Sequence, residues 1–478
     1  MRSILIVHRY LAVLTGLLMS LWCLSGFVMM YQGFPALTSE ARLNGLQPLE
    51  LPDLVKVDLA PAGGFRVEML LGRPVLRAGG VAPIDLFSGD PVPVLSPAQV
   101  ADVARLFASG NGLVGNVAVL GVVDIDQWTL QSARRNAPAW QVALGDAART
   151  QIYINGSTGE VFQSTNRRER VLSWFGAIPH WLYPTVLRQH GQLWTQVVVW
   201  SSVLGSFLAA TGLYVGVARL RRKRGTGALG SPYRGWWYWH HISGLVFGVL
   251  VLTWVVSGLL TMNPWGVLSG RGSEYQQQIV DVAGFSGQGA DLRTLLAGVA
   301  ARDDSFVQLT PAPFGGAFHV MAHRQDGSRV RLGSHGEPSP LDIVEIDRAV
   351  AALELPLLEA GLIHQEDNYY YGHKREVTLP VYRAIVDDAE RTRLYIDLQS
   401  GNVRSINSTD RWSRWLRTGL HDLDFPLLRL RPVWDVVVIV LLLGVTLVCA
   451  TGTWMAVRRV RRDYRAAKKG RLTPQPAS

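Results

Sequence analysis

The sequence predicts an integral membrane protein: an α-helical bundle of four transmembrane helices with two extracytoplasmic α+β domains, arranged as an internal duplication. Three observations predict this fold class. Of the 478 residues, 48% are hydrophobic and only 18% are charged, a balance typical of membrane proteins. Four apolar runs are long enough to cross a bilayer, which requires about 20 residues. The two halves of the chain also match each other in sequence.

The four apolar runs are Tyr10–Tyr31, Leu193–Ala218, Ile242–Met262 and Val433–Val457. The first run exceeds the roughly 7–15 residues of a signal-peptide core, so we expect it to remain as a helix. Cys23 and Cys449 fall in separate runs, which predicts neither a disulfide framework nor a thiolate metal site.

Positive charge is concentrated beside the apolar runs. The net charge is +10, with six Lys or Arg residues in 219–234 and eight in 458–471. This distribution is typical of positive-inside loops and argues against nucleic acid as a partner. We therefore expect a bacterial inner-membrane protein with both termini in the cytoplasm, two periplasmic domains, and the lipid bilayer as its surroundings.

The predicted organisation follows from these runs. It is helix 1 at 1–31, a periplasmic domain at 32–180, helix 2 at 181–218, a basic cytoplasmic loop at 219–235, helix 3 at 236–262, a second periplasmic domain at 263–425, helix 4 at 426–457, and a basic cytoplasmic tail at 458–478.

The internal match has three parts. An offset of 232 aligns "HRYLAVLTGLLMSLWCLSGFVMM" (8–30) with "HHISGLVFGVLVLTWVVSGLLTM" (240–262). An offset of 242 aligns 146–161 with 388–403, and an offset of 240 aligns the second and fourth runs. Because each half contains two spans, both copies have the same orientation, as in a parallel repeat about the membrane normal.

The segments between the runs show local signals of mixed α/β structure. "WQVALGD" and "TQIYINGSTGEVFQS" alternate apolar and polar residues around turn residues, as hairpin strands do. "SPAQVADVARLFA" starts with an N-cap serine and a proline, which predicts a helix. "LDIVEIDRAVAALEL" predicts the corresponding helix in the second half.

Several motifs together resemble a known family. The strand, "(S/T)-G-x-V" turn and strand unit beside helices opening with "HR" and ending in "SG" or "TG" resembles the PepSY domain with its associated transmembrane helices, as do "GAIPHWLY", "SPYRGWWYWHHISGLVFG" and "TMNPW". The resemblance covers nearly the whole chain. It implies similarity to inner-membrane siderophore-iron reductases, which carry haem between their helices.

Four histidines occupy matching places in the two halves. His8 and His240 are aligned at the inner ends of helices 1 and 3, and His180 and His421 each follow a tryptophan by six residues at the outer ends. Histidine near a span usually pairs or marks an ion, proton or redox path. We predict that these four are axial iron ligands of b-type haem, with two haems favoured by the repeat over one.

Small residues occur at the expected heights of these histidines. Ser25-Gly26 and Ser257-Gly258 lie near the outer ends, and Thr211-Gly212 and Thr451-Gly452 near the inner ends. They could accommodate haem, although close helix packing also favours small residues.

Other polar residues are secondary candidates for cofactor binding. His241 takes the place of Arg9 in the repeat, so both are predicted to face a haem propionate or the lipid headgroups, as Arg188 and Arg234 also could. A slip of one position in the helix would exchange the roles of His240 and His241. His190 is a reserve ligand.

Two further histidine-containing stretches are predicted to be surface features. "FHVMAHRQDGSRVRL" predicts a hairpin turning at Asp326-Gly327, with His319 and His323 too far apart to chelate one ion. "HQEDNYYYGHKRE" (364–376) predicts a solvated loop that could instead dock a ferric chelate.

The leading functional prediction is an oxidoreductase that passes electrons through haem b to a periplasmic acceptor. The resemblance implies ferric siderophore as that acceptor, whereas the electron donor, a cytoplasmic reductase or a membrane quinol, is not identified by the sequence. One alternative is a non-catalytic PepSY module that binds or inhibits a peptidase and is held by a membrane anchor. A proton-coupled transporter is a third reading, but the apolar runs have almost no acidic residues at their centres.

Overall fold

The computed structural model describes residues 2–51, 64–79, 81–222, 227–269, 274–280, 289–302, 304–315, 318–372 and 377–472. The chain forms two compact units. The first unit comprises residues 1–34, 171–269 and 412–478, and the second comprises 35–170 and 270–411.

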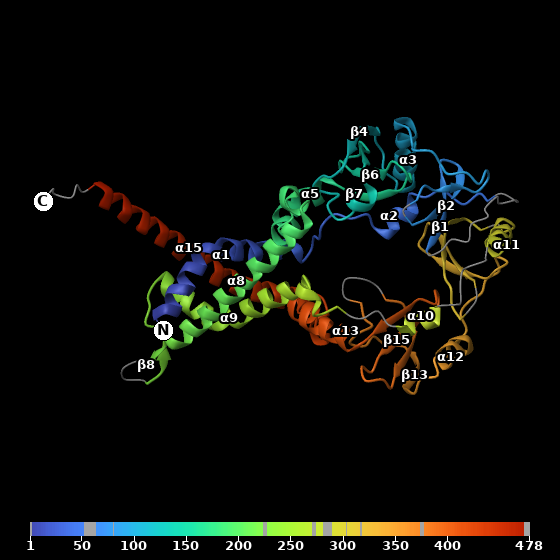
Figure 1. Ribbon diagram of the computed structural model, residues 1–478. Coiled ribbons are helices and arrows are strands. Elements are labelled where there is room, and N and C mark those ends of the chain that lie inside the picture. The colour runs from blue at the N-terminus through green and yellow to red at the C-terminus, as the bar shows by residue number, and fades with distance from the viewer. Residues whose placement is uncertain are drawn as a thin grey trace. The chain divides into compact units, whose positions relative to one another are not determined.

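The first unit is a bundle of four long helices, as the sequence predicted (Figure 1). They are α1 (Arg2–Met29), α8 (Gly191–Ala218), α9 (Trp236–Thr261) and α15 (Val433–Leu472). Each helix is long and apolar enough to cross a membrane. Both α1 and α9 pack against α8 and α15, so α1 and α9 occupy opposite corners of the bundle.

The bundle has an apolar interior and an apolar exterior. Its core includes Met19, Val251, Leu442 and Val445. Large apolar side chains are also exposed on every helix, for example Leu17, Phe207, Val246 and Leu443. An exposed apolar surface that encircles a bundle is suited to lipid rather than water.

Short helical segments lie at the ends of the long helices. Before α8 the chain forms α5 (Arg167–Phe175), α6 (Ala177–His180) and α7 (Thr185–Arg188). Before α15 it forms α13 (Ser408–Ser413), a π-helical turn at Arg414–Gly419, α14 (Leu420–Asp422) and a 3₁₀ turn at Pro426–Leu428. Another 3₁₀ turn, Pro264–Gly266, follows α9, and the small hairpin β8 (Arg221–Arg222) and β9 (Leu229–Gly230) precedes it.

The second unit contains a six-stranded antiparallel sheet in the order β12-β11-β10-β1-β2-β3. The strands are β1 (Phe65–Leu70), β2 (Arg73–Ala78), β3 (Ile84–Asp85), β10 (Phe306–Pro311), β11 (Val320–Arg324) and β12 (Arg329–Leu332). The sequence suggested one separate domain per half, whereas here strands of both halves pair, with Val67 opposite Leu309.

Each half also forms its own four-stranded sheet, in the orders β4-β5-β6-β7 and β13-β14-β15-β16. The first contains β4 (Ala118–Val123), β5 (Ala139–Ala143), β6 (Gln151–Asn155) and β7 (Val161–Thr165). The second contains β13 (Leu357–Ile363), β14 (Val381–Val386), β15 (Arg393–Asp397) and β16 (Val403–Ile406). The offset of 242 therefore aligns β6 with β15, two strands with the same place in their sheets.

Helices complete the second unit: α2 (Ser39–Asn44), α3 (Pro97–Gly110), α4 (Ala133–Asn136), α10 (Glu274–Val280), α11 (Gly289–Ala300) and α12 (Ile343–Ala351). The predicted N-terminus of α3 is confirmed, because Ser96 and Gln99 form a capping box and Pro97 opens the helix. The predicted helix of the second half is confirmed as α12, with Asp342 as its N-cap.

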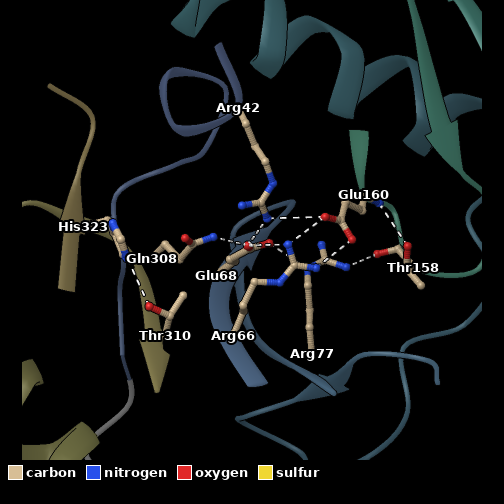
Figure 2. A network of polar contacts seen from close by, with 9 residues as sticks. All are labelled: Arg42, Arg66, Glu68, Arg77, Thr158, Glu160, Gln308, Thr310 and His323. Atoms are coloured by element: carbon tan, nitrogen blue, oxygen red, sulfur yellow. Dashed lines mark hydrogen bonds and ion pairs between the residues drawn. The ribbon is translucent and has the colours of Figure 1, made fainter. Parts of the chain in front are cut away.

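A buried ionic network stabilises the pairing of the two halves in the six-stranded sheet (Figure 2). Glu68 on β1 accepts hydrogen bonds from Arg77 at 2.7 Å and from the Gln308 amide on β10 at 2.5 Å. Arg42 also pairs with Glu68, and Arg66 pairs with Glu160 at 2.8 Å. Burial opposes the charge of Glu68, but the surrounding guanidinium groups and Gln308 outweigh it and keep its pKa below the ordinary value.

The two histidines of the predicted hairpin have structural contacts. The hairpin itself is confirmed as β11 and β12. His319 is buried with its Nε2 3.2 Å from the Ser339 hydroxyl, and His323 is half-buried with its Nε2 3.1 Å from the Thr310 hydroxyl (Figure 2). The prediction of surface residues was wrong for His319, because it packs against the residues that follow β12.

The loop that starts at His364 is described up to residue 372, and 373–376 lie outside the described residues. Its Asp367 accepts hydrogen bonds from the Tyr395 hydroxyl at 2.7 Å and from Arg383 at 3.0 Å. These contacts anchor the loop to the sheet β13–β16. They give Asp367 a structural role in the described part of a stretch that the sequence left open as a chelate-docking loop.

Candidate functional site

His8 and His240 face each other across the helical bundle. His8 lies on α1 and His240 on α9, the two helices at opposite corners. Their ring centroids are 6.5 Å apart, with an angle of 36° between the ring planes. The sequence repeat aligned these two residues, and the fold brings their side chains together.

Backbone carbonyls set the tautomer of this inner histidine pair. Nδ1 of His8 lies 3.1 Å from the Leu208 carbonyl oxygen, and Nδ1 of His240 lies 3.2 Å from that of Val448. A carbonyl can only accept, so in each ring Nδ1 carries the proton. Nε2 then carries the lone pair. This is the tautomer of a histidine that binds a metal ion through Nε2.

His180 and His421 form a second, outer pair. His180 ends α6 and His421 lies in α14, with ring centroids 6.2 Å apart. Nδ1 of His180 is 3.0 Å from the Ser25 hydroxyl, and Nδ1 of His421 is 3.2 Å from the Ser257 hydroxyl.

The serines of the outer pair fix the same tautomer as the carbonyls of the inner pair. Ser25 donates its own proton to the Trp22 carbonyl, and Ser257 donates to the Trp254 carbonyl. Each hydroxyl therefore accepts the proton on the histidine Nδ1. In both pairs the proton is therefore on Nδ1, and Nε2 carries the lone pair that a metal ion would need.

The small residues singled out in the sequence lie at the expected heights. Besides the two serines, Thr211 and Thr451 place their hydroxyls 3.4 Å and 3.1 Å from Nδ1 of His8 and His240. A Cβ on Gly212 would lie 2.8 Å from Cε1 of His8, and one on Gly452 would lie 3.1 Å from Cε1 of His240. These two glycines leave the space that the imidazoles occupy.

The outer pair has this glycine contact on one side only. A Cβ on Gly258 would lie 3.3 Å from Cε1 of His421, whereas one on Gly26 would meet Leu442 instead of His180. The symmetry suggested by the sequence is therefore incomplete at the outer pair.

A cavity of about 850 Å³ adjoins the inner pair. Its walls include His8, His240, the two glycines behind them and an apolar surface from all four long helices. Arginines on α1 and α15, and one that directly follows α8, also line it: Arg9, Arg219, Arg458, Arg459, Arg461, Arg462 and Arg465. Pockets that bind small molecules or cofactors typically have volumes of about 300–1,000 Å³, and this cavity lies within that range.

The donor set and spacing of both pairs fit a haem. A metal–imidazole bond is about 2 Å long, so two imidazoles on opposite sides of one metal ion have ring centres about 6 Å apart. Both observed separations match that value. In the described part of the chain no three His, Cys, Asp or Glu side chains cluster to hold a metal ion. A two-histidine site suits a macrocycle that provides the other four ligands.

Two buried indoles add a second observation. In the described structure, Nε1 of Trp22 and Nε1 of Trp254 are buried without a hydrogen-bond partner. These residues are aligned by the repeat, and each lies one turn before the serine that contacts an outer histidine. A pair of orphaned donors at matching places is suited to a polar group that binds between the helices.

His241 and His190 belong to neither pair, although His241 lines the same cavity as His8 and His240. His241 is buried, and its two ring nitrogens each lie 2.8 Å from an oxygen, the Ser231 hydroxyl and the Gly216 carbonyl. These contacts leave His240 as the residue that meets His8. His190 is exposed at the N-cap of α8, with its Nε2 3.4 Å from Gln189.

The three predicted arginines have three different surroundings. Arg9 lines the cavity beside His8, as a propionate partner would. Arg188 instead stacks over the Trp194 ring at 4.5 Å and the Tyr183 ring at 5.2 Å, and Arg234 is exposed.

Sequence reasoning missed three features of the bundle. It did not single out Arg219 and Arg458 as cavity residues, although both belong to the basic clusters that it found. It did not find the orphaned indoles, although Trp22/Trp254 was among the repeat identities. The separate runs also gave no reason to expect Cys23 and Cys449 to meet, yet their Sγ atoms lie 3.6 Å apart.

Four apolar helices beside separate β-sheets define an integral membrane protein with β-rich soluble regions. The chain belongs to the family described as PepSY-associated TM region, whose profile matches residues 5–459. No curated protein and no solved structure matches the chain significantly.

Proposed function

We propose that the chain is a haem b-containing electron-transfer protein of the bacterial inner membrane that reduces an acceptor at the outer face. The observation that carries this proposal is the recurrence of one geometry. There are two histidine pairs, and in each pair the repeat aligns one member with the other. The two rings of each pair lie about 6 Å apart, and each Nδ1 contacts a protein oxygen. Metal-free packing gives no reason for that arrangement to occur twice.

The residues of each pair would hold one haem. His8 and His240 would ligate the inner haem, and His180 and His421 the outer one. Haem, when bound, supplies a one-electron carrier. The carbonyls and hydroxyls keep each Nε2 unprotonated for ligation, while Gly212 and Gly452 give the inner rings room. Neither cysteine lies in a Cys-x-x-Cys-His sequence, so attachment would be non-covalent, as in b-type haem.

The proposed topology follows the charge distribution and the repeat. The basic segments 219–235 and 458–478 would face the cytoplasm, and the sheet-forming segments the periplasm. The two halves would derive from one duplicated unit of helix, outer segment and helix. The donor would be a cytoplasmic reductase or a membrane quinol.

The proposed acceptor is Fe(III) bound by a siderophore. Hard oxygen ligands hold Fe(III) far more tightly than Fe(II), so one electron would release the iron. This substrate rests on the resemblance to siderophore-iron reductases. Its test is the rate of Fe(II) release from ferric siderophores of different classes by the reduced protein.

The haem proposal is tested by the absorption spectrum of protein purified from haem-sufficient cells, with a pyridine haemochrome titration. We expect a reducible Soret band and a haem:chain ratio that falls by about half in His240→Ala and in His180→Ala. His190→Ala is the matched control, because His190 is exposed and outside both pairs. A colourless preparation would overturn the proposal.

A further inference from the structure

The two cysteines of the chain meet inside the membrane bundle. Cys23 lies on α1 and Cys449 on α15, and their Sγ atoms are 3.6 Å apart. A disulfide bond is about 2 Å long, so the sulfurs would have to approach by only about 1.6 Å. Both are free thiols, with Cys449 buried and Cys23 partly exposed.

Each cysteine is close in sequence to a residue that contacts one of the paired histidines. Cys23 is two residues before Ser25, which contacts His180, and Cys449 is two residues before Thr451, which contacts His240. Cys449 also lines the cavity of the inner pair. A change in bonding between these sulfurs would therefore act on the helix segments that position both sets of rings.

The repeat provides an internal comparison for the role of sulfur. Its offsets place Val255 opposite Cys23 and Ala209 opposite Cys449. Both residues belong to the same apolar cluster as the cysteines. The equivalent positions in the other half are thus both apolar, so packing alone does not require two thiols here.

We propose that Cys23 and Cys449 form a reversible intramembrane disulfide, an oxidative modification site inside the bundle. The surrounding residues include Met19, Trp22 and Phe27, an apolar environment that favours a lipid-soluble oxidant of the quinone class. The dithiol gives two electrons and two protons to the quinone, which becomes the quinol, and one S–S bond replaces two S–H bonds. Thiol–disulfide exchange with an added dithiol reverses the reaction.

The test counts free thiols in the full-length protein in detergent or nanodiscs. After incubation with tetramethylbenzoquinone, whose ring carbons all carry methyl groups and therefore resist thiol addition, the protein is denatured and tagged with a maleimide polymer. The chain has 2 cysteines, so the count should fall from two tags to none. The intact mass should fall by two hydrogen atoms, and dithiothreitol should restore both tags.

Matched variants separate this bond from other reactions. Cys23→Ala and Cys449→Ala should each keep their one remaining tag after the same treatment, and both should stay monomeric on a non-reducing gel. Protein unfolded in dodecyl sulfate before oxidation should keep most of its tags, because the bundle no longer holds the sulfurs together. Two tags retained by the folded wild type, or loss of tags only through covalent dimers, would overturn the proposal. Neither result depends on whether haem is bound.

Discussion

Each paired imidazole is positioned by contacts on two sides. A protein oxygen holds Nδ1, and for His8, His240 and His421 a glycine on the neighbouring helix leaves room for Cε1. Adding or removing a single atom at these residues is therefore expected to change the position of the imidazole rings. The same holds in the second unit, where one carboxylate, Glu68, balances several guanidinium groups.

Gly212→Ala should displace the His8 ring. The new Cβ would lie 2.8 Å from Cε1, closer than real Cβ atoms come to a neighbour, so the ring or helix α8 must shift. Overpacking of this kind typically costs about 1–3 kcal/mol. We expect a lower melting temperature and a loss of the bis-histidine spectrum that the proposed inner haem would give. Gly26→Ala is the control, because its Cβ would meet only the flexible Leu442 side chain at 3.4 Å. Equal effects of both variants would contradict this assignment.

Glu68→Gln should destabilise the second unit in a pH-dependent manner. Removing one partner of a buried ion pair costs about 3–5 kcal/mol, because Arg77 keeps its charge. The pKa of Glu68 is lower in the folded state than its ordinary 4.5. Its ionised form therefore stabilises the fold above that value, and this contribution is lost as the pH falls through the folded pKa.

Thermal unfolding measured across pH provides the check. The difference in melting temperature between wild type and Glu68→Gln should be constant from about pH 7 to 5.5 and shrink below 4.5. Asp102→Asn, which breaks an exposed pair with Arg105, should cost about 0–1 kcal/mol. A difference that grows on acidification would refute the role of Glu68.

At the scale of elements, local sequence signals and long-range pairing contribute differently. The start of α3 follows from Ser96, Pro97 and Gln99, which are adjacent in sequence. The pairing of β1 with β10 joins residues about 240 positions apart and depends on contacts such as Glu68 with Gln308. The first kind of feature can be predicted from a short window, and the second kind cannot.

Ser96→Ala should weaken the first turn of α3. The serine hydroxyl accepts the Gln99 backbone N–H, and loss of such a cap costs about 1 kcal/mol. Hydrogen exchange measured by mass spectrometry should become faster in the first turn of α3. Ser109→Ala, an exposed change at the other end of the same helix, should leave that exchange unaltered. Unchanged protection in Ser96→Ala would show that packing alone holds this helix end.

At the scale of the whole molecule, the proposed electron path needs both histidine pairs. Each pair takes one histidine from each half of the chain, so neither half would form a pair without the other. The hydrocarbon core is about 30 Å thick. With a single haem near one face, an electron would have to cross most of that thickness without a carrier.

Proteoliposomes test this arrangement directly. With a reductant at the face of the basic segments and a ferric chelate at the other, wild type should reduce the chelate across the bilayer. His8→Ala and His421→Ala should each bring the rate down to that of empty vesicles, although each keeps the other pair. His190→Ala should retain the wild-type rate. Full activity with only one pair would refute a two-haem path.

The sequence by itself determined the four spanning helices, the cap of α3, the hairpin of β11 and β12, and the matching positions of the four histidines. The apolar runs are long enough to specify spans without tertiary information. Caps and turns depend on residues that are neighbours in the sequence. The repeat showed which residues of the two halves occupy equivalent positions, although they lie far apart in the sequence.

Only the tertiary structure decided which side chains meet. It paired His240 rather than His241 with His8, brought Cys23 to Cys449, and joined strands of both halves in one sheet. It also distinguished Gly258, where an added Cβ would meet His421, from Gly26, where an added Cβ would meet Leu442 and not His180. The physical reason is that such contacts depend on helix rotation and strand register, and a shift of one residue turns a helical side chain by about 100°. No local pattern in the chain specifies an angle of that kind.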